Sequence, residues 1–301
     1  MAISFKPKNT VKRVYKRVVL GGVGSSGKST AMGTIAKKPL VIDLDDRWPN
    51  DLVDKSDFIK FDENFMGVKR ILNDILNEPK IENDWIVLDT ATKLMALVEE
   101  HVIALDCKGD RDKYNNYGHG LKFVPQYVRE ILGLIDEIQE KHKVNFCFIC
   151  HTRVKQFSNP LLAEGYQKNC LDLPDIVSGM LMQWADYVGY AWFSTEVVGK
   201  RAVGDFERFV SFTPGATYEA KNSSPFILPE KIVFDKEGKW ANIVFGDTQE
   251  LLKELTELVA RYPEDRRKDI QDNIDRLHVK SFGQAELRSF IDAGKSKLGN
   301  K

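Results

Sequence analysis

The sequence is poor in cysteine, and its four thiols form no recognisable metal-binding motif. Cys147 and Cys150 have CxxC spacing, but they lie in the apolar run 144–150, which predicts a buried strand. Because side chains alternate along a strand, the two thiols are expected on opposite faces, and a zinc site needs ligands beyond a single pair. The pattern favours core packing over metal or redox chemistry and is typical of a reducing cytoplasm.

The sequence also lacks net charge and long apolar runs. It has 44 basic and 44 acidic residues, so no overall field attracts it to nucleic acid or membranes, and any such binding must come from local patches. No apolar run approaches the roughly 20 residues that span a bilayer, and the N-terminus lacks the apolar core of a signal peptide. We therefore expect a cytoplasmic protein without a membrane partner.

What the sequence does contain is a regular alternation of strand-like and helix-like segments. Apolar strand patterns end near residues 20, 44, 89 and 150, and amphipathic helical patterns lie between them. This order predicts an α/β fold with a mainly parallel sheet. We predict a core at 15–246, a small helical appendage at 247–301, and a basic arm at 1–14, which is either a solvated tail or a contact for phosphate backbones.

The segment 22–29 matches the pattern GxxxxGK[ST] between an apolar strand and a helix. Its glycines let successive backbone N–H groups point at phosphate oxygens, and the helix adds its positive N-terminal end. Lys28 is expected to reach the β- and γ-phosphates, and Ser29 to ligate Mg²⁺. We therefore predict that the chain binds ATP and Mg²⁺. The predicted nucleotide-binding residues are Gly22, Gly24, Ser25, Ser26, Gly27, Lys28, Ser29 and Thr30.

A second element of the predicted nucleotide site is the acidic end of the apolar strand at 84–89. Ligands bind at the carboxyl ends of strands in open α/β sheets, and Asp89 occupies that position. A buried strand often ends in aspartate, so this signal gains its weight from the phosphate-binding loop. Asp89 is predicted to hold the metal ion, directly or through a water molecule.

Hydrolysis needs a group that orients or deprotonates a water molecule at the γ-phosphate. Asp45 and Asp46 follow the strand after the phosphate-binding loop, and we favour Asp45 as this base, with an exposed turn carboxylate as the alternative. His151 directly follows the predicted strand 144–150 and is predicted to sense the γ-phosphate, the alternative being a structural histidine. The predicted catalytic residues are Lys28, Asp45, Asp89 and His151.

Together these residues resemble the RecA-like P-loop ATPases, and in particular the phage and prophage AAA-type proteins that include single-strand-annealing ATPases. The resemblance covers about residues 15–235 and implies a RecA-like core, homo-oligomers, and phage recombination or replication proteins as partners, in the host cytoplasm if the chain is phage-encoded. It maps the general base to Asp45 and the sensor to His151. In such assemblies a lysine pair reaches the neighbouring subunit's γ-phosphate, and Lys221 matches the first of the pair, whereas the second position is Ser223.

The resemblance further implies that two loops face single-stranded DNA, at 107–118 and 152–173. Basic residues interleaved with aromatic ones suit a single strand, because cations meet phosphates and rings stack on bases. Acidic residues offset the charge of the first loop, so the second, which is expected to be long and irregular, is favoured. Its predicted DNA-binding residues are Arg153, Lys155, Phe157, Tyr166 and Lys168.

The leading hypothesis is an ATPase that assembles on single-stranded DNA. A small-molecule P-loop kinase is a second interpretation, which ranks lower because no arginine-rich lid segment is evident. A nucleotide-binding scaffold without useful turnover is a third.

Overall fold

The computed structural model describes residues 15–35, 38–58, 64–158, 164–198, 201–204, 207–223, 227–235, 238–246, 249–276 and 284–299. The predicted basic arm, 1–14, lies outside these ranges. The chain divides into two compact units. The first comprises Met1–Gly21, Ala36–Arg153 and Leu171–Tyr187, and the second comprises Gly22–Ile35, Val154–Cys170 and Val188–Lys301.

The first unit contains a sheet of the order β1-β5-β4-β2-β3. Its strands are β1 (Arg17–Gly22), β5 (Asn145–Phe157), β4 (Trp85–Asp89), β2 (Leu40–Asp43) and β3 (Asp57–Phe58). β2 pairs in parallel with β3 and β4, and β4 with β5. Val87 and Cys147 are fully buried partners in this register, as expected for a parallel sheet covered on both faces. The predicted α/β fold with a mainly parallel sheet is confirmed.

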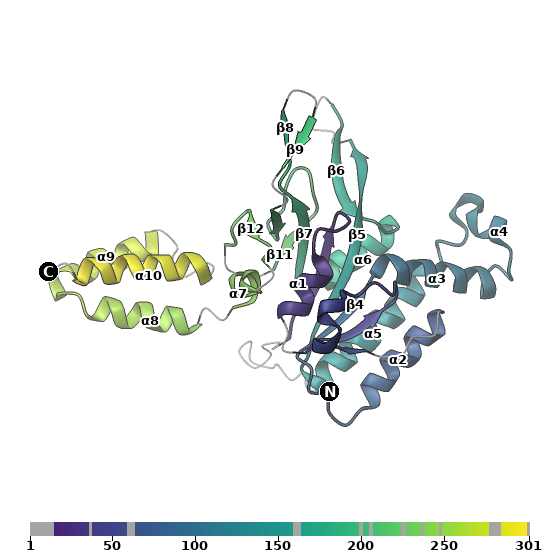
Figure 1. Ribbon diagram of the computed structural model, residues 1–301, viewed down its shortest axis with the longest axis horizontal. Coiled ribbons are helices and arrows are strands. Elements are labelled where there is room, and N and C mark those ends of the chain that lie inside the picture. The colour runs from purple at the N-terminus through teal and green to yellow at the C-terminus, as the bar shows by residue number, and fades with distance from the viewer. Residues whose placement is uncertain are drawn as a thin grey trace, which may run out of the picture. The chain divides into compact units, whose positions relative to one another are not determined.

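Helices of the first unit bury regular apolar faces. They are α2 (Phe65–Asn77), α3 (Ala91–Leu105), α4 (Arg111–Asn115), α5 (Val124–His142) and α6 (Asp175–Trp184), with 3₁₀ turns η2 (Asn50–Lys55) and η3 (Asn116–Gly118). α2, α3 and α5 pack against one another (Figure 1). The side chain of Asn64 caps α2 by accepting from the Gly67 amide, and Thr90 caps α3 by accepting from Lys93. These caps fix where each helix begins.

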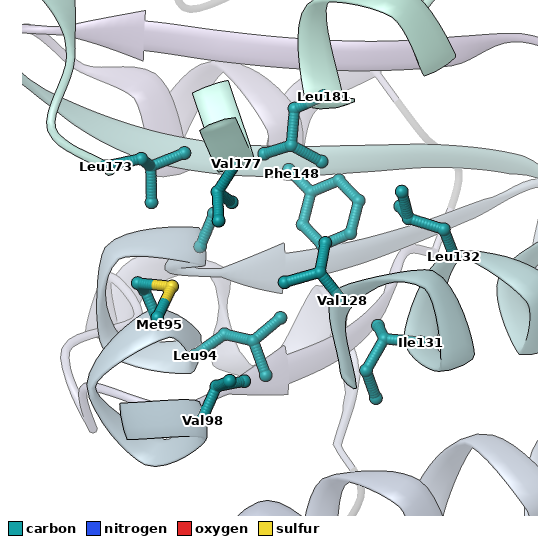
Figure 2. A pocket seen from close by; sticks show the side chains of 11 residues that line it. Leu94, Met95, Val98, Val128, Ile131, Leu132, Phe148, Leu173, Val177 and Leu181 are labelled. Atoms are coloured by element: carbon teal, nitrogen blue, oxygen red, sulfur yellow. The ribbon is translucent and has the colours of Figure 1, made fainter. Parts of the chain in front are cut away.

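The core of the first unit encloses a cavity of about 20 Å³ between α3, α5, α6 and β5. Leu94, Val128, Phe148 and Leu181 point toward one another around it (Figure 2). This volume is close to that of one water molecule, and the lining offers almost no polar surface to hold one. The cavity is therefore a packing void and not a binding site.

The four cysteines are all buried as free thiols. Burial raises the pKa of the Cys147 thiol well above its ordinary value, and it raises the pKa of Cys170 to about 11. Both groups are therefore protonated at neutral pH and unreactive as nucleophiles. This state agrees with the packing role expected from the sequence.

The second unit begins with the phosphate-binding loop and α1 (Lys28–Ile35) and has an antiparallel sheet. β7 (Tyr187–Phe193) pairs with β10 (Arg208–Ser211), which pairs with β12 (Ile232–Val233). In this register Phe209 lies opposite both Trp192 and Val233. The remaining short elements are β11 (Lys221–Asn222), which pairs with β7, the ribbon of β8 (Glu196–Val198) and β9 (Arg201–Val203), and α7 (Lys239–Phe245).

The segment 152–173, which was expected to be a long irregular loop, is instead largely a β-hairpin. β5 continues as far as Phe157, and β6 (Tyr166–Leu171) pairs with it. The prediction of irregular structure was wrong because strand pairing overrides the polar composition of both arms. Residues 159–163 of this segment lie outside the described ranges.

The C-terminal helices have a hydrophobic cluster of their own. α8 (Gln249–Ala260) packs against α10 (Gln284–Gly299) and α9 (Glu264–Arg276) (Figure 1). The buried residues of this cluster are Leu251, Leu255, Leu258, Ile274, Leu287 and Ile291. The predicted helical appendage is confirmed, whereas the boundaries 15–246 and 247–301 stay a prediction. No helix in the described part of the chain has the length and apolar character needed to cross a membrane.

Candidate nucleotide-binding site

The phosphate-binding loop lies between β1 and α1, in the strand–turn–helix context that the sequence predicts. Two of its glycines are required by the backbone. A Cβ on Gly22 would collide with the carbonyl oxygen of Ala191, which also accepts a hydrogen bond from the Val23 amide at 3.3 Å. Gly27 has φ +88°, a left-handed conformation that favours glycine. The loop thus depends on glycine where the motif places it.

The ammonium group of Lys28 is held by the loop itself. Its Nζ donates to the carbonyl oxygens of Gly22 at 3.1 Å and Val23 at 2.9 Å, and to Ser26 Oγ at 3.5 Å. The Lys28 side chain is buried, so its charge is kept next to the curled backbone and not in solvent. This arrangement presents a desolvated cation where the motif predicts phosphate oxygens.

The other predicted nucleotide-binding residues differ in exposure. Ser26 is fully buried, whereas Gly24 and Ser25 at the tip of the loop are exposed. Ser29 and Thr30 lie in the first turn of α1 and are half-buried. A helix of this kind directs its first N–H groups and its positive end toward an anion.

The acidic strand ends belong to the first unit, whereas the phosphate-binding loop belongs to the second. Asp89 ends β4 with only 5% of its surface exposed. In the parallel register its partner is Asp43, and its carbonyl oxygen accepts from the Leu44 amide at 2.7 Å. The predicted metal-side carboxylate is therefore buried at the carboxyl end of a central strand.

The three aspartates that follow or end β2 have different surroundings. Asp43 accepts hydrogen bonds from the amides of Asp45, Arg47 and Trp48 at 3.2, 3.0 and 2.9 Å, so its carboxylate organises the turn. Asp46 is exposed and has φ +52°. Asp45 is half-buried and accepts a hydrogen bond from a side chain of the first unit, Thr90. These contacts distinguish Asp45 from its neighbours.

Thr90 is a site residue to which the sequence analysis assigned no role. Its Oγ1 accepts from the Lys93 amide at 3.1 Å as the cap of α3, and it donates to Asp45 Oδ2 at 2.9 Å. Because the oxygen accepts from the helix, its own hydrogen is directed at the carboxylate. Thr90 therefore fixes the orientation of Asp45.

Thr92 holds the backbone of β5 at His151 in a similar way. Its Oγ1 accepts from the His151 amide at 3.2 Å and lies 3.5 Å from Cys150 Sγ. The His151 carbonyl oxygen accepts from the Asp172 amide at 2.8 Å, so the backbone of His151 is fixed on both sides. The pattern Asp89-Thr-Ala-Thr92, two hydroxyl residues after a strand-end aspartate, was the available signal for both threonines.

The hairpin groups most of the predicted DNA-binding residues. Side chains two residues apart lie on the same face of a strand. Lys155 and Phe157 therefore share a face of β5, and Tyr166 and Lys168 share a face of β6. The rings of Phe157 and Tyr166 stack with centroids 6.0 Å apart, and Lys168 Nζ lies 5.7 Å from the centroid of Phe157. Rings and ammonium groups therefore occur together on a half-buried surface.

Arg153 and Lys221 have different environments. Arg153, at the end of the first unit, donates to the Leu173 carbonyl oxygen at 2.9 Å and lies 3.6 Å from Asp172 Oδ1. Lys221 is a half-buried residue of β11. Arg153 thus links the start of the hairpin on β5 to the residues that follow β6.

The fold and the loop define an α/β protein of the P-loop nucleotide-binding class. The sequence matches the family described as AAA domain over residues 15–224. The chain therefore belongs to this AAA domain family, which confirms the P-loop prediction at the level of the family.

Two solved structures are similar to the chain. The flagellar accessory protein FlaH from Methanocaldococcus jannaschii is 13% identical with a TM-score of 0.38, over 77% of this chain and 92% of that one. The RadB recombinase is 11% identical with a TM-score of 0.40, over 74% and 90%. A search of curated proteins gives no match.

Proposed function

We propose that this protein is an ATPase of phage-type DNA recombination or replication that acts on single-stranded DNA as a homo-oligomer. The observation that supports it best is the phosphate-binding loop, in which the buried Lys28 ammonium is held by the carbonyl oxygens of Gly22 and Val23. In this proposal Lys28 and the loop N–H groups bind the phosphates. Lys221 acts on the nucleotide of a neighbouring subunit.

The residue types fit a magnesium ion. Mg²⁺ prefers oxygen ligands and is usually held by one or two protein groups together with substrate phosphates. Ser29 offers a hydroxyl and Asp89 a carboxylate that is buried at the end of β4. When bound, the ion would neutralise charge on the phosphates.

The proposed chemical step uses Asp45. Its carboxylate, oriented by the Thr90 hydroxyl at 2.9 Å, accepts a proton from or orients the attacking water molecule. The assignment of Asp45 over Asp46 rests on this hydrogen bond and on the exposure of Asp46. His151 is proposed to report the γ-phosphate to the hairpin, because it lies on the same strand, β5.

The proposed DNA surface is the hairpin face that carries Lys155, Phe157, Tyr166 and Lys168. Ammonium groups neutralise phosphates with release of counterions, and aromatic rings stack on bases without sequence preference. The stacked pair Phe157–Tyr166 with Lys168 over it supplies both kinds of group.

The test is phosphate release from ATP by the full chain, with and without single-stranded DNA, followed by sizing with ATP. We expect turnover that DNA stimulates, a larger assembly with ATP, and loss of turnover in Lys28→Ala. Lys80→Ala, at a lysine that is 79% exposed, serves as the charge-matched control and should behave as wild type. Near-normal turnover in a folded Lys28→Ala protein would overturn the nucleotide site, and binding without phosphate release would favour the scaffold.

A further inference from the structure

Arg208 lies against the phosphate-binding loop within the second unit. It begins β10, and its Cα pairs with that of Phe193 on β7. A Cβ placed on Gly27 would be 3.0 Å from Arg208 Cδ, 3.4 Å from Nε and 3.7 Å from Cζ. The arginine side chain therefore packs directly on the glycine that precedes Lys28.

The guanidinium group of Arg208 contains a buried hydrogen-bond donor. Its Nε is buried, and none of the described residues accepts a hydrogen bond from it. Its Cζ also lies 5.8 Å from the centroid of the Phe193 ring. A buried donor without an acceptor destabilises the protein, whereas an anion placed there would offset that cost.

We infer that Arg208 binds the phosphate chain of the nucleotide in its own subunit, as a second cation beside Lys28. Three facts lead to this: the contact with Gly27, the buried Nε without an acceptor, and the cation–π contact that holds the guanidinium in place. Arginine suits this role because its planar fork of donors matches phosphate oxygens.

This role differs from those assigned above. Lys221 is proposed to act on a neighbour's nucleotide, whereas Arg208 acts in cis and needs no assembly. Arg208 does not take part in metal binding or in proton transfer, so its removal weakens nucleotide binding more than the chemical step. The inference rests on the proposed binding of ATP by the phosphate-binding loop.

The test measures affinities of the full chain for ATP and ADP by titration calorimetry, for wild type, Arg208→Met and Lys28→Ala. Lys231→Met is the matched control, because Lys231 makes a similar cation–π contact, with Nζ 5.4 Å from the Phe209 centroid, on the neighbouring residue of β10. We expect Arg208→Met to weaken nucleotide binding by about 10- to 100-fold, as for loss of a charge-assisted hydrogen bond. Lys231→Met should leave it unchanged.

A second readout separates ligand binding from a structural role. The unfolding temperature without nucleotide should be similar in wild type and Arg208→Met, while the increase caused by ATP should be smaller in the variant. A purely structural arginine would give the reverse, a lower unfolding temperature with an unchanged increase, and that result would overturn the inference. If Arg208→Met does not fold, Arg208→Gln decides, because it removes the charge and keeps a polar side chain: unchanged affinity overturns the inference.

Failure of the inference is distinguishable from failure of the proposed function. If Lys28→Ala loses nucleotide binding while Arg208→Met binds as wild type does, the loop binds ATP and only the role of Arg208 is wrong. If wild type binds neither ATP nor ADP, both are wrong.

Discussion

The two units differ in the charge of the groups they contribute to the proposed reaction. The first unit contains the carboxylates at the ends of β2 and β4, among them Asp45 and Asp89. The second contains cations, Lys28 in the phosphate-binding loop and Arg208 against it. In the proposed function, water activation therefore belongs to the first unit and phosphate binding to the second.

Within each unit, side chains of the same charge differ in the contacts they make. Asp43 is engaged by three backbone amides, and Asp45 by a single hydroxyl. In the second unit Lys28 is bound to the loop, whereas Lys168 lies over an aromatic ring. Changes at Asp45 should therefore slow the chemical step, changes at Arg208 should weaken nucleotide binding, and changes at Lys168 should weaken DNA binding.

The largest effect on the chemical step alone is expected from Asp45→Asn. Asparagine keeps the shape and the hydrogen bond from Thr90 but cannot take a proton, so the rate of hydrolysis should fall by about 100-fold or more. ATP affinity should stay close to that of wild type. Single-turnover hydrolysis together with calorimetry would measure both quantities.

Asp46→Asn is the matched control, because Asp46 is the exposed neighbour. It should hydrolyse ATP as wild type does. Normal hydrolysis by Asp45→Asn together with an inactive Asp46→Asn would show that the base was assigned to the wrong residue.

Thr90→Val should have a smaller effect on the same step. It removes the hydrogen bond that orients Asp45, which we expect to slow hydrolysis by about tenfold. It also removes the cap of α3, which should lower the free energy of unfolding by about 1 kcal/mol. Thr90→Ser keeps both hydrogen bonds and should restore both quantities. A Thr90→Val protein with normal turnover would mean that Asp45 needs no orientation by Thr90.

Much of the phosphate-binding loop was predictable because its chemistry lies in eight consecutive residues. The parallel sheet was predictable as well, since strands such as 84–89 are continuously apolar. Thr90 could have been predicted as a site residue because it directly follows Asp89. Its hydrogen bond to Asp45 could not, because Asp45 follows a different strand.

The hairpin and the contacts of Arg208 and Arg153 depend on pairing between segments far apart in the sequence. The sequence alone does not specify this pairing. The mainly polar segment 152–157 forms a strand because β6 pairs with β5. Arg208 reaches Gly27 only because β10 follows β7 in the sheet, and no local motif marks it. The bracing contact of Arg153 with Leu173 has the same origin.

The hairpin offers a several-fold effect on DNA binding. Replacing Lys155 and Lys168 together by Ala should weaken single-strand binding and reduce the slope of log affinity against log salt by about 1.4, at about 0.7 per lost phosphate contact. Basal hydrolysis should remain. Arg153 is left in place, because its replacement would disturb the base of the hairpin.

The control is a double variant of equal charge, Lys253→Ala with Lys268→Ala, at exposed positions of α8 and α9. It should bind a labelled oligonucleotide with the wild-type slope. An unchanged slope in the hairpin variant would locate the DNA contacts elsewhere, with residues 1–14 next to be tested.

The smallest expected effect is a difference between the two units in how their stability depends on pH. His101 packs against Phe65 and Tyr127, with ring centroids 4.7 and 4.8 Å away. Burial lowers its pKa below the ordinary value; Asp106 and Glu130 oppose this shift, and Lys69 adds to it. The unfolded chain therefore binds the proton more readily than the folded one, so stability falls as pH decreases through the ordinary histidine value of about 6.5.

In the second unit, the pKa of Glu254 on α8 is lowered by Lys295, so its contribution is lost only at more acidic pH, near and below 4.5. Between pH 7 and 5, hydrogen exchange corrected for intrinsic rates should show lower protection in α3 and α5, with little change in α8 and α10. His101→Phe keeps a ring against Phe65 and Tyr127 and removes the titration, so it should reduce the loss of protection in α3 and α5. An identical loss in wild type and His101→Phe would show that another group causes it, and an equal loss in α8 and α10 would show that the two units do not differ in this respect.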